Sequence, residues 1–502
     1  MNEIMKTVLC LTILSSFLMR LAPCARAEDA TNQIKSLTLR ECIARGLENN
    51  LETKSERINP TIGTWGVVGA QGVYDPVLAG SISYRDSTTH QLGTGTNGVP
   101  ALEEQTLTPN LSLAGKLPTG ATYDLSAIDT RSSGNTVSNF LHAGSAAINV
   151  TQPVLKNFGL GVNSALIRVA RANRSVAIQN FVQFVMSKIS EVSNAYYELV
   201  YAIENHKAAL ETRELARQLL DENRQREKIG TMSRLDVIQA ESGVASSEQA
   251  VILTGRAIKD NENTLKRLIC QQVSEFRGVS LDPVDYPTVH MIATDVGQST
   301  RTALQMRADY LSAKHALDRQ NILVQFNRNQ LWPEIDLLGS YGFNGRSRGD
   351  FGDFIDNTAS GHYPVWSAGV AVTVPIGNRQ ARANYHTARL QAEQQLLLLK
   401  ELEQDIIVQV DNAVGHVETN LKSVEAARAA NRLAQESLDA EKKKLLAGTS
   451  TTFLVLQAQS QLAAARSAEI RARADYSESL VALDLAEGTV LQRNNIQLDE
   501  KF

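Results

Sequence analysis

The chain has 502 residues, of which 43% are hydrophobic, 21% are charged and only 5% are aromatic. This length suits two or three ordinary domains, and the shortage of aromatic residues favours long helices packed on small side chains over one large globular core. The net charge of −4, without a dense run of Lys or Arg, argues against nucleic acid as a partner.

The N-terminus predicts a signal peptide over residues 1-27. A lysine precedes an apolar run, and Ala25-Arg26-Ala27 fits a signal-peptidase site that leaves Glu28 as the first mature residue. The alternative is a lipidated Cys24, against which Pro23 stands where a small residue is expected. Either route takes the protein out of the cytoplasm.

Two further features limit the architecture. After cleavage only Cys42 and Cys270 remain, too few for a disulfide framework, and a bridge between them is improbable. No later segment holds the ~18 uninterrupted apolar residues of a membrane helix. If the chain crosses a membrane, we therefore expect it to cross with strands.

Six segments alternate apolar and polar residues with the period of a strand. In chain order they are Leu78–Arg85, Leu107–Leu117, Ala121–Arg131, Ala146–Thr151, Ile335–Asn344 and Trp366–Val374. In Leu107–Leu117 the leucines are expected to face lipid and the polar residues water. The stretches between them that are rich in Gly, Ser, Thr and Asn predict loops, at His90–Pro100, Ser132–Asn139 and Gly345–Gly361.

The rest of the chain predicts helices. Apolar residues recur every three or four positions from Phe181 to Ile203 and from Ile406 to Val424, which is typical of long helices that pack side by side. The segment between Pro153 and Gly230 is long enough for a helix on the order of 100 Å at ~1.5 Å per residue. Such a helix would exceed any compact domain.

One short phrase occurs twice, as KIGTMSRLDVIQAES and LAGTSTTFLVLQAQS. The shared positions include Gly230-Thr231 in the first copy and Gly448-Thr449 in the second. Glycine adopts left-handed backbone conformations that other residues resist. Each Gly-Thr pair therefore predicts a tight reversal between two antiparallel helices.

The two phrases belong to a repeat that covers the mature chain. Leu47, Pro76 and Tyr84 recur at one constant spacing as Leu304, Pro333 and Tyr341, and Pro153 recurs as Pro375. Proline lacks an N–H and disfavours helix in the residue before it, so the four prolines predict junctions between helices and strands. The predicted units are 28-294 (strands 77-152, helical hairpin 155-270), 295-490 (strands 333-375, hairpin 378-488) and a tail, 491-502.

In order, duplication and spacing, the chain resembles the TolC-like outer membrane efflux proteins over about residues 37 to 490. The segments that show this resemblance are LTLRECIARGLENN, VTQPVLKNFG, VTVPIG and the two Gly-Thr phrases. The resemblance implies a mainly α fold with a transmembrane β-barrel. It implies a homotrimer with one shared barrel in outer-membrane lipid and a long α-barrel in the periplasm. It also implies that tip residues Gly230, Thr231, Gly448 and Thr449 dock a periplasmic adaptor, or membrane fusion protein, that is coupled to an inner-membrane transporter.

Two further predictions concern the number of strands in the barrel and the residues of the periplasmic gate. The hairpin Leu107–Arg131, turned at Pro118-Thr119-Gly120, predicts six strands per subunit and about eighteen in a trimer, against about twelve in better-known members. Pro109, which cannot donate a ladder hydrogen bond, favours the alternative of a hairpin outside the wall or in the lumen. The resemblance implies a periplasmic gate at Asp236 and Leu454. A solvated or capping Asp236 is equally open.

The gate positions also depart from the family. Leu445, Ser450, Leu454 and Gln457 stand where the family's tyrosine, basic and acidic residues are expected, so its salt-bridged lock and acidic rings are doubtful in this chain.

An enzyme is not predicted. The eight histidines sit singly, and there is no HExxH, paired CxxC or nucleophile-elbow motif, so the sequence predicts no catalytic residue, cofactor or metal. We expect a passive outer-membrane conduit for efflux or type I secretion. The alternative is a periplasmic coiled-coil adaptor or scaffold without a pore, and the transported substrate is not defined by the sequence.

Overall fold

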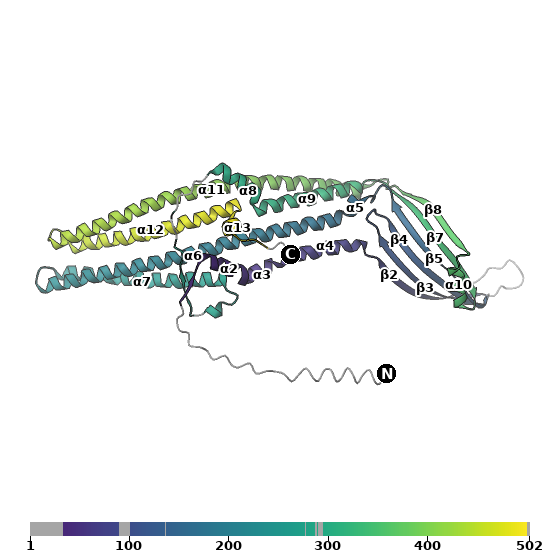
Figure 1. The fold of residues 1–502 in the computed structure, drawn as a ribbon, viewed down its shortest axis with the longest axis horizontal. Helices are drawn as coiled ribbons and strands as arrows, with labels where there is room; N and C mark the ends of the chain where they lie inside the picture. The colour runs from purple at the N-terminus through teal and green to yellow at the C-terminus, as the bar shows by residue number, and fades with distance from the viewer. Residues whose placement is uncertain are drawn as a thin grey trace, which may run out of the picture.

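The computed structural model describes residues 34–89, 101–135, 137–276, 278–286, 289 and 295–498. The predicted signal peptide, Cys24 and the predicted loop His90–Pro100 lie outside these residues. The molecule is elongated, with a sheet at one end and the turns of two helical hairpins at the other (Figure 1).

The two hairpins account for most of the length. The first consists of α6 (Ala165–Lys228) and α7 (Arg234–Ile269), and the second of α11 (Arg379–Leu446) and α12 (Thr452–Glu487). Helix α6 has 64 residues, which corresponds to about 96 Å. A short helix, α5 (Leu160–Asn163), precedes α6, so the first hairpin begins later than the predicted residue 155.

Shorter elements lead into the strands and close the middle of the molecule. They are α2 (Leu39–Asn49), α3 (Leu51–Glu56), α4 (Ile58–Gln71), the 3-10 turns η1 (Gly72–Tyr74) and η2 (Val273–Phe276), α8 (Val296–Met306), α9 (Ala308–Asn329) and α13 (Val490–Arg493). Helix α2 starts at a capping box, in which Glu41 N donates to Thr38 Oγ1 and Thr38 N donates to Glu41 Oε2, both at 3.2 Å. Among the described residues no helix is both long and apolar enough to cross a membrane.

The six predicted strands form one antiparallel sheet. They are β2 (Val77–Thr89), β3 (Leu102–Lys116), β4 (Thr122–Gly134), β5 (Val137–Pro153), β7 (Glu334–Arg348) and β8 (Pro364–Thr373), in the order β2-β3-β4-β5-β7-β8. The hairpin of β3 and β4 is paired on both sides, so it belongs to the sheet. Pro109 faces Ile82 of β2, and the pairing of β3 with β4 is interrupted beside it, as a residue without an N–H requires.

The register gives the sheet two different faces. One row across all six strands is Leu78, Leu113, Leu125, Ile148, Tyr341 and Trp366. The neighbouring row, which points to the opposite side, is Ala79, Ser112, Ser126, Ala147, Gly342 and Val365. All six side chains of the first row are exposed, with Leu78 at 68% and Trp366 at 72%. We call the side that carries this row the apolar face and the other side the polar face.

A small parallel sheet, absent from our predictions, closes the middle of the molecule. It pairs β1 (Ile34–Leu37) with β6 (Ser280–Pro283). The hydroxyl of Tyr196, a fully buried residue of α6, donates to Leu37 O at 3.2 Å and accepts from Asp285 N at 2.9 Å. The core around this point also takes in α2, α7 and Val490 of α13.

Two predicted loops need correction, and the predicted tail can be placed. The stretch Gly345–Gly361 is not a loop, because β7 extends to Arg348 and helix α10 (Phe351–Ala359) follows. The stretch Ser132–Asn139 is mostly strand, since β4 runs to Gly134 and β5 begins at Val137. The predicted tail is anchored as far as it is described, because Leu491, Ile496 and Leu498 pack against the central core.

Candidate functional site

Both Gly-Thr pairs end a long helix with the same hydrogen-bonded turn. Gly230 N donates to Glu227 O at 2.9 Å and Thr231 N to Arg226 O at 2.9 Å. In the second hairpin Gly448 N donates to Leu445 O at 3.2 Å and Thr449 N to Lys444 O at 3.0 Å. This pair of bonds defines the Schellman motif, which satisfies the last carbonyls of a helix.

The motif requires a left-handed residue at each glycine. Gly230 has a φ of +75° and Gly448 a φ of +73°. A Cβ atom at either position would meet nothing within 4 Å, so the space around both turns is open. Glycine is needed here for its backbone conformation and not for close packing.

The helices that leave the two turns start differently. In α7 the cap is reciprocal, with Asp236 N donating to Ser233 Oγ at 3.3 Å and Ser233 N donating to Asp236 Oδ2 at 3.3 Å. In α12 the cap residue Thr451 makes no side-chain capping bond, and Ser450 Oγ donates instead to Glu441 Oε1. The two tips thus share their turn but present different polar groups.

The two turns lie side by side and line one open cavity of about 750 Å³. Arg226 Nη1 on the first hairpin donates to Leu445 O on the second at 3.4 Å. Gly230, Thr231 and Gly448 line this cavity, whereas Thr449 is exposed beside it. The cavity forms a surface of mixed polar and apolar character at the end of the molecule.

A buried asparagine joins the hairpins behind this cavity. Asn223 of α6 is fully buried, and its Nδ2 donates to Thr452 Oγ1 at 3.1 Å and to Asp236 O at 3.4 Å. We did not predict this residue from the sequence. The sequence signal that could have identified Asn223 is its helical spacing from Ala216, Leu219 and Leu220, which places a polar residue on a buried face.

The two predicted gate residues, Asp236 and Leu454, lie on α7 and α12. The carboxylate of Asp236 accepts hydrogen bonds from Ser233, which is the capping role that the sequence left open. Leu454 lies on α12 with 42% of its surface exposed. A gating role for either residue therefore stays a prediction.

The four junction prolines stand where strands meet helices. Pro76 lies directly before β2 and Pro333 directly before β7. Pro153 is the last residue of β5, and Pro375 lies between β8 and α11.

No cluster of metal ligands stands out in the described part of the chain, because no group of three or more His, Cys, Asp or Glu residues could hold an ion. A polar network surrounds Arg471, whose Nη1 lies 2.7 Å from Glu198 Oε1 and whose Nη2 lies 2.6 Å from Asp475 Oδ1. Burial and the nearby Glu198 raise the pKa of Glu478 in the same network. These contacts connect α6 to α12, so the network is explained by its role in holding the two helices together.

Fold and tips together define an elongated protein in which a six-stranded sheet is joined to two long helical hairpins with similar turns. The family model for outer membrane efflux proteins matches residues 106–271 and 300–489. The chain therefore belongs to the outer membrane efflux protein family, and the predicted location in the outer membrane, extending into the periplasm, is confirmed by this membership.

Two curated relatives are similar in sequence over part of their length. Nodulation protein T of Rhizobium leguminosarum bv. trifolii is 24% identical over 335 residues, which are 65% of this chain and 66% of that protein. The outer membrane efflux protein BepC of Brucella suis is 27% identical over 273 residues, which are 53% of this chain and 55% of BepC. The match thus spans less than two thirds of either relative.

The fold is also that of a solved channel. The Campylobacter jejuni CmeC outer membrane channel superposes with a TM-score of 0.66 at 17% identity, covering 92% of this chain and 90% of that one. This likeness supports the arrangement of sheet and helical hairpins.

Proposed function

We propose that the chain is one subunit of a passive trimeric conduit for efflux or type I secretion across the periplasm and outer membrane. The two faces of the sheet carry this proposal. An exposed apolar face suits lipid and a polar face suits a water-filled lumen, which is the division found in outer-membrane strands. A periplasmic scaffold without a pore gives no reason for such a sheet.

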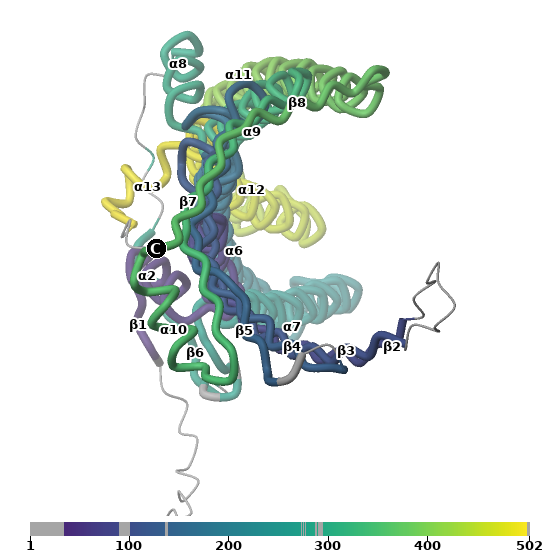
Figure 2. The backbone as a smooth tube through the Cα atoms, turned by 90° about the vertical axis from the view of Figure 1, so that its right-hand side faces the viewer, coloured from purple at the N-terminus to yellow at the C-terminus, as the bar shows by residue number. Residues whose placement is uncertain are grey.

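Closure of the wall would need further copies of the chain. Within the described residues β2 and β8 each pair with one neighbour, and the sheet is curved (Figure 2). Three copies joined edge to edge would give about eighteen strands and no free edge. The exposed apolar residues Ile62 and Trp65 of α4, next to β2, fit burial between subunits.

The tips supply the proposed docking surface. Gly230, Thr231, Gly448 and Thr449 would contact a periplasmic adaptor, and an inner-membrane transporter would supply the energy through that adaptor. The shared Schellman turns present two similar surfaces per subunit, and the open cavity between them gives an adaptor a place to insert.

The test of the proposed function is conductance. Purified protein in planar bilayers is expected to conduct ions without nucleotide, because the sequence has no phosphate-binding loop of the GxxxxGK[ST] type. A scaffold would leave the bilayer sealed. Hydrolysis of ATP by the protein alone would contradict the passive conduit.

Thiol labelling tests the position of the extra hairpin. Single cysteines at Leu111 and Leu113, on the apolar face, are expected to react with a lipid-soluble reagent. Single cysteines at Asn110 and Ser112, on the polar face, are expected to react with a water-soluble one. If all four react equally from water, the hairpin lies outside the wall.

The unmodified chain controls for background in this experiment. Its Cys42 and Cys270 are free but buried, and burial raises the pKa of Cys42 to about 12, so little thiolate is available to react.

A further inference from the structure

Helix α10 lies on the apolar face of the sheet, not in the lumen. Phe354 is buried beneath the helix, and its ring centroid lies 6.1 Å from that of His142 on β5. Gly345 of β7 permits this approach, since a Cβ there would come within 1.8 Å of Thr358 Oγ1. In Figure 2 α10 lies on the outer, convex side of the curved sheet.

The helix marks one end of the apolar band. On the apolar face, the apolar part of β7 extends from Ile335 to Phe343, a length of about 27 Å at ~3.4 Å per residue. This length fits the ~25 Å band of an outer-membrane strand that is tilted. Beyond it the same face carries Arg131 and His142, so α10 lies at the boundary between apolar and polar surface.

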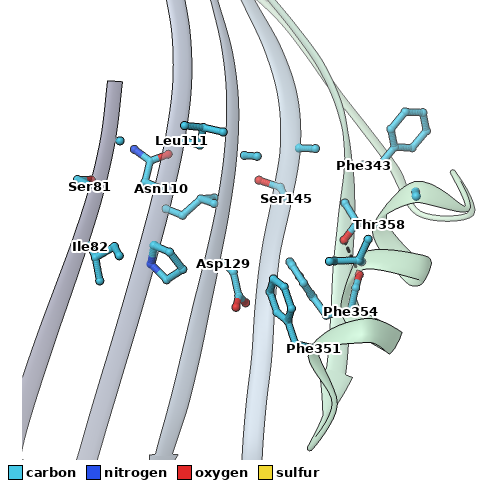
Figure 3. Close-up of a pocket in the computed structure, with 17 residues that line it drawn as sticks. Ser81, Ile82, Asn110, Leu111, Asp129, Ser145, Phe343, Phe351, Phe354 and Thr358 are labelled. Carbon is cyan, nitrogen blue, oxygen red and sulfur yellow. Dashed lines mark hydrogen bonds between the residues drawn. The ribbon is translucent and has the colours of Figure 1, made fainter. Parts of the chain in front are cut away.

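An open groove of about 950 Å³ runs from α10 across the neighbouring strands. Its floor is low because Ala127 and Ala146, neighbours in one row between Leu111 and Phe343, have short side chains. Figure 3 shows Phe351 and Phe354 on one side of the groove and Ile82 and Leu111 on the other. The floor is therefore bordered by two walls of large apolar side chains.

Among the described residues one ion pair borders the groove, through Asp129 in its lining, and it is largely covered. His142 Nδ1 lies 2.8 Å from Asp129 Oδ2, and both side chains are only 8% exposed. Phe351 and Phe354 stack 5.9 Å apart over the pair. Most of the surface that remains open to an occupant is apolar, including Phe351 at 50% and Ile355 at 48% exposure.

We propose that this groove binds an acyl chain of a lipid from the surrounding outer membrane. The inference rests on the proposed function, which places the apolar face against lipid. Three observations favour an acyl chain: the groove is continuous with the exposed apolar face, its open lining is mostly hydrocarbon, and its volume lies in the range of pockets that enclose a small ligand, about 300–1,000 Å³. An amphipathic helix at the edge of the apolar band is also typical of a membrane interface.

Two neighbouring alanines provide a matched test. Ala146→Leu fills the floor of the groove, whereas Ala147→Leu makes the same change on the polar face of the same strand. Ile355→Asp is a second variant, which places a charge in the α10 wall without altering a strand. Phosphatidylethanolamine is titrated into delipidated trimer in detergent, and the bound lipid is counted by native mass spectrometry.

We expect Ala146→Leu and Ile355→Asp to weaken lipid retention about tenfold, the effect of losing contact with roughly two methylene groups. Ala147→Leu is expected to bind as the wild type does. Equal retention by all four proteins, or a protein segment in the groove in place of lipid, would overturn the proposal. Conductance in planar bilayers distinguishes failure of the proposed function from failure of the lipid site. A wild type that does not conduct refutes the proposed function. Variants that conduct and bind as much lipid as the wild type refute only the proposed lipid site in the groove.

Discussion

Gly230→Glu and Gly448→Glu are each expected to weaken binding of the periplasmic adaptor about tenfold or more while the trimer still assembles. Each glycine holds a left-handed conformation that costs an L-residue about 1–2 kcal/mol. The open space around both turns means that the new side chain meets no clash. The turn must therefore rearrange, or a charge must project from the proposed docking surface, and about 1.4 kcal/mol already corresponds to tenfold in affinity.

Two further variants separate the turn from the charge. Gly415→Glu adds the same side chain to an exposed glycine within α11 that has open space but no left-handed backbone. Gly230→Asn keeps a residue that tolerates the left-handed region and should bind nearly as the wild type does. Adaptor capture in a pull-down is the measurement. Unchanged capture by both glutamate variants would remove the tips from the docking surface.

The strands were predictable because alternation with a period of two is local. The predicted segment Leu107–Leu117 became β3 (Leu102–Lys116), and Ala121–Arg131 became β4 (Thr122–Gly134). The turn between them also matches, since Gly120 N donates to Leu117 O at 2.9 Å and Gly120 has a φ of +99°. Proline and glycine limit the backbone whatever the rest of the chain does, so their positions could be interpreted directly.

Helix α10 was missed although its signal was present. Phe351, Phe354, Ile355 and Thr358 have the spacing of one helical face, and Asp350 caps the helix by accepting from Gly352 N at 2.9 Å. The surrounding glycines and serines made the stretch resemble a loop. A nine-residue helix is too short for periodicity alone to outweigh that composition.

Contacts between distant segments could not be predicted from the sequence. Strands β1 and β6 are four residues each and pair across nearly half of the chain, so neither has a local pattern that predicts its partner. At the candidate site the repeated phrase predicted both glycine turns. It could not predict Asn223, whose role depends on Thr452 in the other hairpin.

Asp484 is expected to contribute stability that is lost as pH rises from about 4 to 7, and Asp484→Asn is expected to remove this contribution. Burial raises the pKa of Asp484 to about 7, with Glu487 adding to the shift and Arg493 opposing it. The folded protein therefore holds this proton up to about pH 7, whereas the unfolded chain releases it near pH 3.8. Between these values Asp484 binds more protons in the native state than in the unfolded chain, so its contribution to stability is greatest below pH 3.8 and is lost as pH rises through 7.

The effect is large because the side chain of Asp484 is only 16% exposed. A shift of this size corresponds to at most about 4 kcal/mol of unfolding free energy. The measurement is the denaturation midpoint of the purified protein in detergent at pH 5 and pH 8, followed by circular dichroism. Asp439→Asn, which removes an exposed carboxylate from α11, is the control for loss of charge. Glu478→Gln isolates the contribution of the other carboxyl whose pKa is raised by burial. If Asp484→Asn keeps the full pH dependence of the wild type, Asp484 does not carry its proton in the folded state, and its pairing with Arg493 at 2.9 Å outweighs its burial.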